Sequence, residues 1–343
     1  MSALSPRLPW HTQLGSQRDW AWRGWQIRYT YLRAQTPAPD AVPIVFLHGF
    51  GAALTQWRLN LEPLSQHHTV YALDLLGFGA SEKGAANYKV DLWMAQVRDF
   101  CREIVGRPVV LVGHSLGALV ALAIAATDPA LVQGLILLTL PASRQELLPG
   151  KLQSFVGEIE SFFSSPLLLK PLFSVIRRPG VIRSVLRAVY ANPETITDEL
   201  VQSFTIPAGD RGAAKVLCRL VQARTQTDFS PSTQSLLQAV DLPILLLWGE
   251  KDRVIPLVWG RQLPAMNPKL KLIELPGAGH CPYDECADRV NREILAWVDH
   301  CVSKVNAGVA NAGMANAGGV NAGMANAGAV NAGGTNQPPS PKA

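Results

Sequence analysis

Short apolar runs and longer amphipathic segments alternate along residues 20–300 of this 343-residue chain. Runs rich in Val, Ile and Leu that are bounded by Pro or Gly are typical of buried strands, and longer segments with helical periodicity are typical of helices. The pattern predicts strands over 26–32, 43–47, 69–73, 108–112, 134–138, 243–248 and 269–275, and helices over 91–105, 118–126, 258–263 and 284–300. This alternation favours a parallel sheet with helices on both faces.

Residues 141–240 interrupt the alternation because their pattern is helical only. A helical block inserted between two strands predicts a cap over the carboxyl ends of the sheet, where open α/β sheets bind their ligands. We therefore expect the α/β core at 20–140 and 241–301. Residues 1–19 are expected to form a flexible leader, and the Asn-Ala-Gly repeat of residues 302–343, which lacks aromatic residues and nearly all charge, predicts a disordered tail.

The stretch VVLVGHSLGALVALAIAA, residues 109–126, contains a motif with chemical meaning. Gly113, Ser115 and Gly117 form G-x-S-x-G between a predicted strand and a predicted helix. In such an elbow a nucleophilic Ser sits on a strained turn, and small residues flank it where chain packs on chain. Taken alone, the motif also fits a tight turn with an incidental Ser.

A Ser nucleophile needs a general base and an acid that orients the base. Of the seven histidines, His280 follows a strand in the loop GAGH and precedes a helix, so it is placed to reach the sheet edge. Glu250 and Asp252 both follow the strand at 243–248 and lie between Ser115 and His280. We favour Asp252 because it lies further into the loop, before the segment VIP that leads the chain away from the edge.

An acyl-transfer enzyme also needs donors for the oxyanion that develops on the substrate carbonyl. The backbone N–H of Leu116 directly follows Ser115 in the motif. The segment HGFG, residues 48–51, follows a predicted strand, and its Gly-rich turn can aim the backbone N–H of Phe50 at the same place. The sequence therefore predicts an oxyanion hole made by these two backbone groups.

Composition narrows the class of protein. The formal net charge of +5 is mild and shows no interleaving of basic and aromatic residues on one element, so we expect no nucleic-acid partner. The five cysteines are scattered without a C-x₂-C pair, so we expect neither a disulfide framework nor a metal, and no cofactor is implied. No apolar run approaches the roughly 18 residues of a membrane span, and no signal peptide is evident. These features predict a location in the cytoplasm or at the periphery of an internal membrane.

The segment 166–190 of the expected cap is apolar and basic and contains no acidic residue. Its basic residues are Lys170, Arg177, Arg178, Arg183 and Arg187. The common interpretation is a cap helix with a solvated basic side. A second interpretation is a lid that rests on an anionic membrane and admits a lipid-like ester.

The ordered set HGFG, DLLGFGAS, GHSLGA, WGEKD and GAGH is similar to the motifs of the α/β-hydrolase fold family and extends over residues 25–300. The resemblance implies an eight-stranded, mostly parallel sheet and a catalytic triad, which maps onto Ser115, Asp252 and His280. Haloalkane dehalogenases and epoxide hydrolases of this family use an Asp at the elbow. Ser115 therefore implies a different reaction.

Three further segments resemble the pheophytinase and dephytylase group, whose pheophytinases remove phytol from pheophytin. They are SVIRRPGVIRSVLRAVY at 174–190, PLVWG at 256–260 and GHCPYDE at 279–285. This resemblance implies hydrolysis of a bulky, apolar carboxylic ester, of long-chain or phytyl type, through an acyl-enzyme. Two alternatives stay open: an acyltransferase that uses the same triad, and a non-catalytic receptor of this fold for a small apolar ligand.

Overall fold

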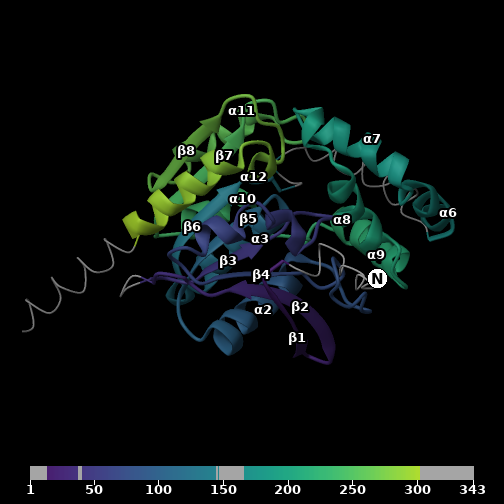
Figure 1. Cartoon of the computed structure of the whole chain (residues 1–343), viewed down its shortest axis with the longest axis horizontal. Helices are drawn as coiled ribbons and strands as arrows, with labels where there is room; N and C mark the ends of the chain where they lie inside the picture. Colours follow the sequence, from purple (N-terminus) through teal and green to yellow (C-terminus); the bar gives the residue numbers. More distant parts are fainter. Residues whose placement is uncertain (1–13, 38–40, 144–145, 147–165, 302–343) are drawn as a thin grey trace, which may run out of the picture. The chain divides into compact units, whose positions relative to one another are not determined.

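The fold is built on one eight-stranded sheet (Figure 1). The computed structural model describes residues 14–37, 41–143, 146 and 166–301. Strands β1 and β2 join the sheet antiparallel, and the six strands from β4 onwards along the order are parallel, so the expected mostly parallel sheet is confirmed. In spatial order the strands are β1 (Ser16–Trp22), β2 (Trp25–Leu32), β4 (Val70–Leu73), β3 (Ile44–Leu47), β5 (Val109–His114), β6 (Val132–Leu138), β7 (Ile244–Gly249) and β8 (Leu270–Leu275).

Strand β1 lies partly inside the expected flexible leader, so the leader boundary at residue 19 was wrong for residues 16–19. Trp20 and Trp22 are buried while most of their neighbours in the strand are exposed, which is the alternation of a strand with one covered face. Their indole N–H groups donate to Glu103 and Asp99, and these bonds fasten β1 to the helical segment at 90–105. Residues 1–13 of the leader and the whole tail at 302–343 lie outside the described residues.

Helices cover both faces of the sheet, and the side chains of alternate strand residues pack into two separate hydrophobic cores, one on each face. In β3, Val45 and Leu47 join one core, while Ile44 and Phe46 join the other. The first core includes α2 (Val90–Phe100), its π-helical extension Cys101–Val105, α3 (Leu116–Thr127) and α11 (Leu257–Gly260). The second includes the 3₁₀ turn Leu54–Trp57, α1 (Leu61–Leu64), α12 (Pro282–Glu285) and the helix at 287–301.

The described part of residues 141–240, which we call the helical insertion, contains helices and turns but no strand. Helices α6–α9 gather beside the sheet (Figure 1), whereas α10 packs on α3 and belongs to the first core. Their bounds are α6 (Pro166–Ile176), α7 (Pro179–Val189), α8 (Asp198–Ala208), α9 (Ala213–Thr225) and α10 (Thr233–Ala239), with a 3₁₀ turn at Pro193–Thr195.

Candidate active site

Ser115 stands between the end of β5 and the start of α3 in a strained backbone conformation, with φ 50° and ψ −113°. A Cβ on Gly113 would lie 2.3 Å from the carbonyl oxygen of Gly117, and a Cβ on Gly117 would lie 2.2 Å from that of Leu47. Both separations are impossible for real side chains, so the flanking glycines are required sterically. The turn is therefore the strand–elbow–helix that the sequence predicted, and it packs directly on the end of β3.

The HGFG loop starts where this contact is made, because residue 48 follows the last residue of β3. Among the described residues, the backbone N–H groups of Phe50 and Leu116 donate no hydrogen bond. Leu116 is the first residue of α3, so its N–H has no acceptor inside the helix. The structure thus leaves both predicted oxyanion donors unpaired, on two segments that are in contact through Gly117 and Leu47.

Asp252 and His280, 28 residues apart, come together beyond the carboxyl ends of β7 and β8. His280 Nδ1 lies 2.8 Å from Asp252 Oδ2, and both side chains are buried. The other carboxylate oxygen of Asp252 accepts the backbone N–H groups of Val254 and Ile255, each at 2.8 Å. The carboxylate is therefore held in one orientation, with Oδ2 directed at the imidazole.

Glu250, the other acid that the sequence offered, is exposed and accepts the Gly277 backbone N–H at 3.4 Å. It has no contact with His280 among the described hydrogen bonds. Thr139, which the sequence analysis did not single out, donates its hydroxyl to Asp252 Oδ2 at 3.2 Å. It follows β6, the neighbour of β7, and only the order of strands in the sheet brings the two residues together.

Ser115 is partly buried, and its hydroxyl makes no hydrogen bond to His280 among the described residues. The preceding residue, His114, does contact His280: the two rings lie 4.8 Å apart, and His114 Nε2 lies 2.9 Å from the backbone oxygen of His280. The elbow and the Asp252–His280 pair are therefore adjacent. Catalytic hydrogen bonds in ligand-free enzymes are often long and tighten when substrate binds.

Two other ionisable residues near the loop at 48–51 serve the structure. Asp74 accepts the backbone N–H groups of Leu54 and Ala80 at 2.6 and 2.7 Å, and burial raises its pKa to about 6. His48 Nε2 accepts the Leu75 N–H at 3.0 Å, while Nδ1 donates to the Gly49 carbonyl oxygen at 2.7 Å. Burial lowers the pKa of His48 to about 4, so its imidazole is neutral at pH 7.

This depressed pKa of His48 predicts a loss of stability in mild acid. The folded state binds fewer protons than the unfolded state between pH 6.5 and about 4, so the free energy of unfolding falls as the pH falls through that window. Between pH 7 and pH 5, His48 should account for a loss of about 2 kcal/mol. His48→Gln cannot titrate, so its loss over this interval, measured by urea unfolding, should be smaller by about that amount. Equal losses in the two proteins would contradict the prediction.

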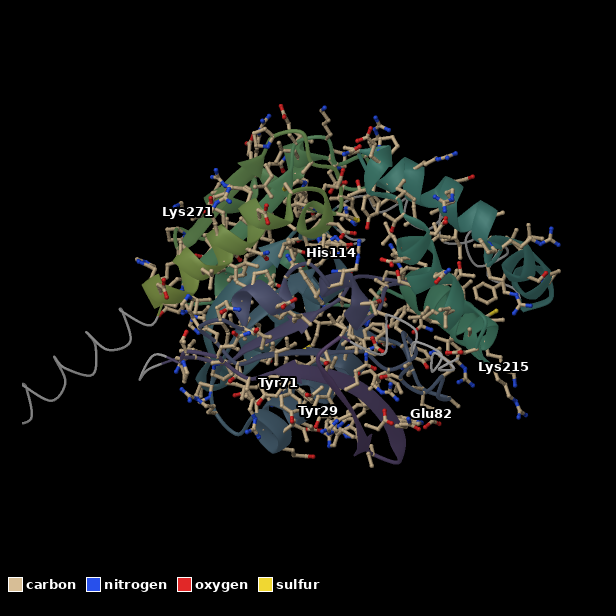
Figure 2. All side chains as sticks on the ribbon, viewed as in Figure 1. Tyr29, Tyr71, Glu82, His114, Lys215 and Lys271 are labelled. Atoms are coloured by element: carbon tan, nitrogen blue, oxygen red, sulfur yellow. The ribbon has the colours of Figure 1, made fainter. Side chains whose placement is uncertain are left out.

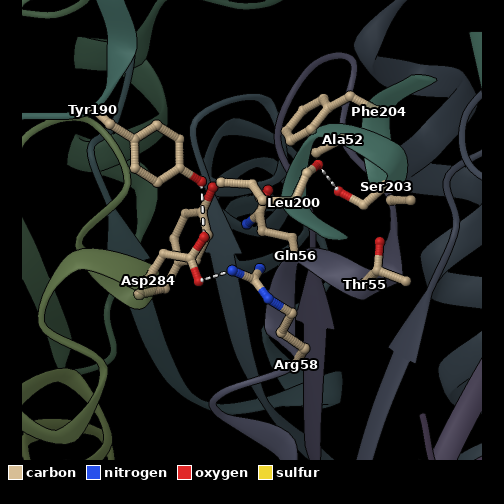
Figure 3. A pocket seen from close by; sticks show the side chains of 11 residues that line it. Ala52, Thr55, Gln56, Arg58, Tyr190, Leu200, Ser203, Phe204 and Asp284 are labelled. Carbon is tan, nitrogen blue, oxygen red and sulfur yellow. Dashed lines mark hydrogen bonds and ion pairs between the residues drawn. The ribbon is translucent and has the colours of Figure 1, made fainter. Parts of the chain in front are cut away.

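The turn of α12 joins the His280 loop to the helical insertion through two acids. Asp284 pairs with Arg58 at 2.6 Å and accepts the Tyr190 hydroxyl at 2.8 Å (Figure 3). Burial raises the pKa of Asp284, while Arg58 and Tyr190 oppose that shift. Glu285 accepts the Gly279 backbone N–H with one oxygen and those of residues 191 and 192 with the other. The end of α7 is therefore fastened beside the loop that carries His280.

Within the described ranges, no group of three or more His, Cys, Asp or Glu residues is arranged to hold a metal ion. No helix in the same ranges is both long and apolar enough to cross a membrane. None of the cysteines at 101, 218, 281, 286 and 301 forms a disulfide within the described residues.

Known proteins are similar to this chain in sequence and in fold. The chloroplastic pheophytinase of Arabidopsis thaliana is 26% identical over 321 residues, which cover 81% of this chain and 65% of that protein, so the chain spans just under two thirds of its length. The uncharacterized hydrolase YugF of Bacillus subtilis (strain 168) is 27% identical, with 76% of this chain and 91% of that protein covered. The solved serine hydrolase of carbazole degradation, CarC, has a TM-score of 0.67 at 20% identity and covers 82% of this chain and 98% of its own.

The family comparison agrees with the topology. The alpha/beta hydrolase family matches residues 44–293, a span that runs from β3 to the helix after α12 and includes Ser115, Asp252 and His280. Strands β1 and β2 lie outside the match and supply the antiparallel edge of the sheet. Since the matched span is well over half of the chain, the protein belongs to the alpha/beta hydrolase family.

Proposed function

We propose that the protein is a serine-dependent carboxylic ester hydrolase, with Ser115 as nucleophile, His280 as general base and Asp252 as the acid that orients it. The observation that carries the proposal is the 2.8 Å bond from His280 Nδ1 to Asp252, made beside a Ser in a strained elbow. A structural turn would not require the strain at Ser115, and a buried His–Asp pair with no task would not be expected beside it. The Ser elbow also distinguishes this chain from the Asp-dependent reactions of the fold.

The proposed reaction has two steps. In the first, His280 Nε2 takes the proton of the Ser115 hydroxyl as Oγ attacks the ester carbonyl, and the protonated His280 then gives that proton to the leaving alcohol. In the second, water attacks the acyl-enzyme, gives its proton to His280, and releases the acid while Ser115 is protonated again. The unpaired N–H groups of Phe50 and Leu116 are the proposed donors to the oxyanion in both steps, each worth about 2.7–4 kcal/mol.

We propose a bulky apolar ester as substrate, with a phytyl ester such as pheophytin as the first candidate. The similarity to pheophytinase supports this class of substrate. Apolar side chains are also left exposed on the loops that carry the proposed site and on the helical insertion: Phe50, Val254 and Val185 are 42%, 49% and 51% exposed. Covering such surface with a long hydrocarbon chain supplies binding free energy at about 25 cal/mol per Å². The helical insertion would act as the cap that provides part of this surface.

A comparison of substrates tests the proposal. The purified protein should hydrolyse pheophytin or a long-chain p-nitrophenyl ester with a higher kcat/KM than the acetyl ester, and chlorophyll serves as the closely related comparison. Product analysis with and without an added alcohol separates hydrolysis from acyl transfer. If only short soluble esters react, the long-chain specificity is wrong. If no ester reacts with protein that is shown to be folded, the ester hydrolase itself is wrong.

Two single variants on α7, Val185→Asp and its control Ser184→Asp, test whether this helix contacts the long-chain substrate. Val185→Asp puts a charge on an exposed apolar position. The neighbouring Leu186 is unsuitable for this test, because it is 5% exposed and a charge there would disrupt the buried core. We expect Val185→Asp to lower kcat/KM for the long-chain ester about tenfold while leaving the acetyl ester within twofold. Ser184→Asp, at an exposed polar position of the same helix, is the control and should leave both values unchanged. Equal effects of the two variants would contradict a substrate-binding role of Val185.

We also propose that α6 and α7 rest on an anionic membrane surface. Leu172 and Val175 on α6 are 51% and 42% exposed, Arg177 and Arg178 directly follow that helix, and Arg187 lies on α7; all three arginines are exposed. No acidic residue occurs between 166 and 190, and the nearby Asp198 of α8 pairs with Arg183. Exposed apolar residues with an excess of cations fit the interface of a negatively charged bilayer, where each basic residue contributes about 1 kcal/mol.

Vesicle sedimentation tests this contact. The protein should bind vesicles that contain phosphatidylglycerol but not pure phosphatidylcholine vesicles, and binding should weaken in high salt. Arg177→Glu/Arg178→Glu should lower the partition coefficient at least tenfold. The control, Arg18→Glu/Arg107→Glu, changes the net charge by the same amount at two exposed arginines outside the helical insertion, and it should have a smaller effect. Equal losses in both would mean that net charge, not this surface, determines binding.

A further inference from the structure

The backbone of His280 is held at two points besides the bond from its side chain to Asp252. Its N–H donates to the carbonyl oxygen of Val189, at the end of α7, at 3.3 Å. Its carbonyl oxygen accepts a hydrogen bond from His114 Nε2 at 2.9 Å. The residue that fixes this carbonyl is therefore the one that precedes Ser115 in the chain, 166 positions away from His280.

His114 is a neutral hydrogen-bond donor in this arrangement. Burial lowers its pKa well below the ordinary value, and the nearby His280 lowers it further. A carbonyl oxygen can only accept, so the proton of the neutral imidazole sits on Nε2. Nδ1 is then a bare acceptor, and among the described residues it has no hydrogen-bond partner. Within the described part of the chain, the bond from Nε2 to the His280 carbonyl is therefore the only hydrogen bond of the His114 side chain.

The His114 ring is also wedged between the other parts of the site. Figure 2 marks it in the interior, and its ring lies edge-on to that of Tyr283, with centroids 4.9 Å apart. A Cβ on Gly49 would lie 2.7 Å from His114 Nδ1, so the HGFG loop passes the ring as closely as a glycine permits. One side chain therefore contacts the loop of the proposed oxyanion donors, the turn of α12 and the loop of the proposed base.

We propose that His114 is a positioning residue that sets the His280 loop relative to the elbow through its Nε2–H bond to the His280 carbonyl. The inference rests on the proposed serine hydrolase function. Asp252 fixes the orientation of the imidazole about its Nδ1–H bond but not the distance of the loop from Ser115. His114 supplies that second restraint from the residue bonded directly to Ser115, so the nucleophile and the base keep their separation when the surrounding loops move.

Paired substitutions test the hydrogen bond itself. His114→Leu has a similar volume and no donor, so the buried His280 carbonyl loses its partner. His114→Gln carries an amide nitrogen about as far from the backbone as Nε2 and can restore the bond. We expect His114→Leu to lower kcat on a soluble ester on the order of tenfold with KM within twofold, and His114→Gln to recover most of the loss. Rates are referred to folded protein, and the melting temperature of each variant is measured alongside.

A spectroscopic signal separates positioning from a general loss of structure. The His280 Nδ1–H that bonds Asp252 should give a low-field proton resonance, which His114→Leu should broaden or shift and His114→Gln should retain. If His114→Leu does not fold, His114→Asn replaces it, because its shorter side chain keeps polarity but places the donor too far from the carbonyl.

Different results would contradict the positioning role of His114 and the proposed hydrolase function. Wild-type kcat and an unchanged resonance in a folded variant without the donor would overturn the inference, as would a loss in His114→Gln equal to that in His114→Leu. Activity that persists in Ser115→Ala would instead refute the proposed function. The two failures are therefore distinguishable.

Discussion

Ser115→Ala is expected to abolish ester hydrolysis and covalent labelling by a fluorophosphonate. The substitution removes the only atom that forms a bond to the substrate in the proposed mechanism, so kcat should fall by a factor on the order of 10⁵ or more. The effect on folding should be small, because the Ser115 side chain makes no capping hydrogen bond to α3. The fluorophosphonate label, located by mass spectrometry, should appear on Ser115 in the wild type.

Ser184→Ala is the matched control for this experiment. Ser184 is exposed on α7, and its hydroxyl donates to the Gly180 carbonyl one turn earlier. The control should keep wild-type labelling and kcat. Persistent labelling or turnover in folded Ser115→Ala would show that another residue is the nucleophile, and the serine hydrolase proposal would then be wrong even though the fold is that of the family.

Local features of the site could be predicted from the sequence because they depend on short stretches of chain. The elbow requires Gly113 and Gly117, since any side chain at either position would meet backbone atoms. This requirement appears in the sequence as the G-x-S-x-G motif. The core strands were visible for a similar reason. Each is buried on both faces, so it appears as a short run composed mostly of Val, Ile and Leu.

Features that depend on contacts between distant segments could not be predicted in this way. Strand β1 begins SQRD, a polar sequence, and it is held by pairing with β2 and by two indole hydrogen bonds to the segment at 90–105. Thr139 reaches Asp252 only because β6 and β7 are neighbours. The contact between His114 and His280 spans 166 positions. Neither the alternation of strands and helices nor the motifs specify such pairs.

The acids of α12 illustrate the same limit. In the sequence GHCPYDE, Asp284 and Glu285 open a helix, which is a common and favourable place for acidic residues. In the structure they bond Tyr190, Arg58 and the backbone at 191–192, and so connect the helical insertion to the base loop. Their partners lie 93 to 226 positions away in the chain. Only the folded structure therefore shows that these acids make long-range contacts, in addition to standing at the start of a helix.

Asp252→Asn is expected to lower kcat by about 10⁴ while leaving the fold in place. With the amide oxygen kept toward Val254 and Ile255, the amide nitrogen faces His280 Nδ1, where the carboxylate oxygen now accepts. Two donors cannot share that bond, so the imidazole takes the tautomer with its proton on Nε2 and can no longer accept the Ser115 proton. With the amide reversed, its nitrogen faces two backbone N–H donors instead, which costs stability of the loop.

Glu250→Gln is the matched control, because this acid follows the same strand and was the alternative that the sequence left open. Its carboxylate is exposed and accepts the Gly277 N–H, a bond that the amide oxygen of Gln can keep. Its kcat should stay within twofold of the wild type, measured with the same soluble ester and the fluorophosphonate labelling rate. A large loss in Glu250→Gln with near-normal turnover in Asp252→Asn would transfer the orienting role to Glu250. Because the buried Asp252 carboxylate accepts both the loop N–H groups and the imidazole, we expect the opposite result.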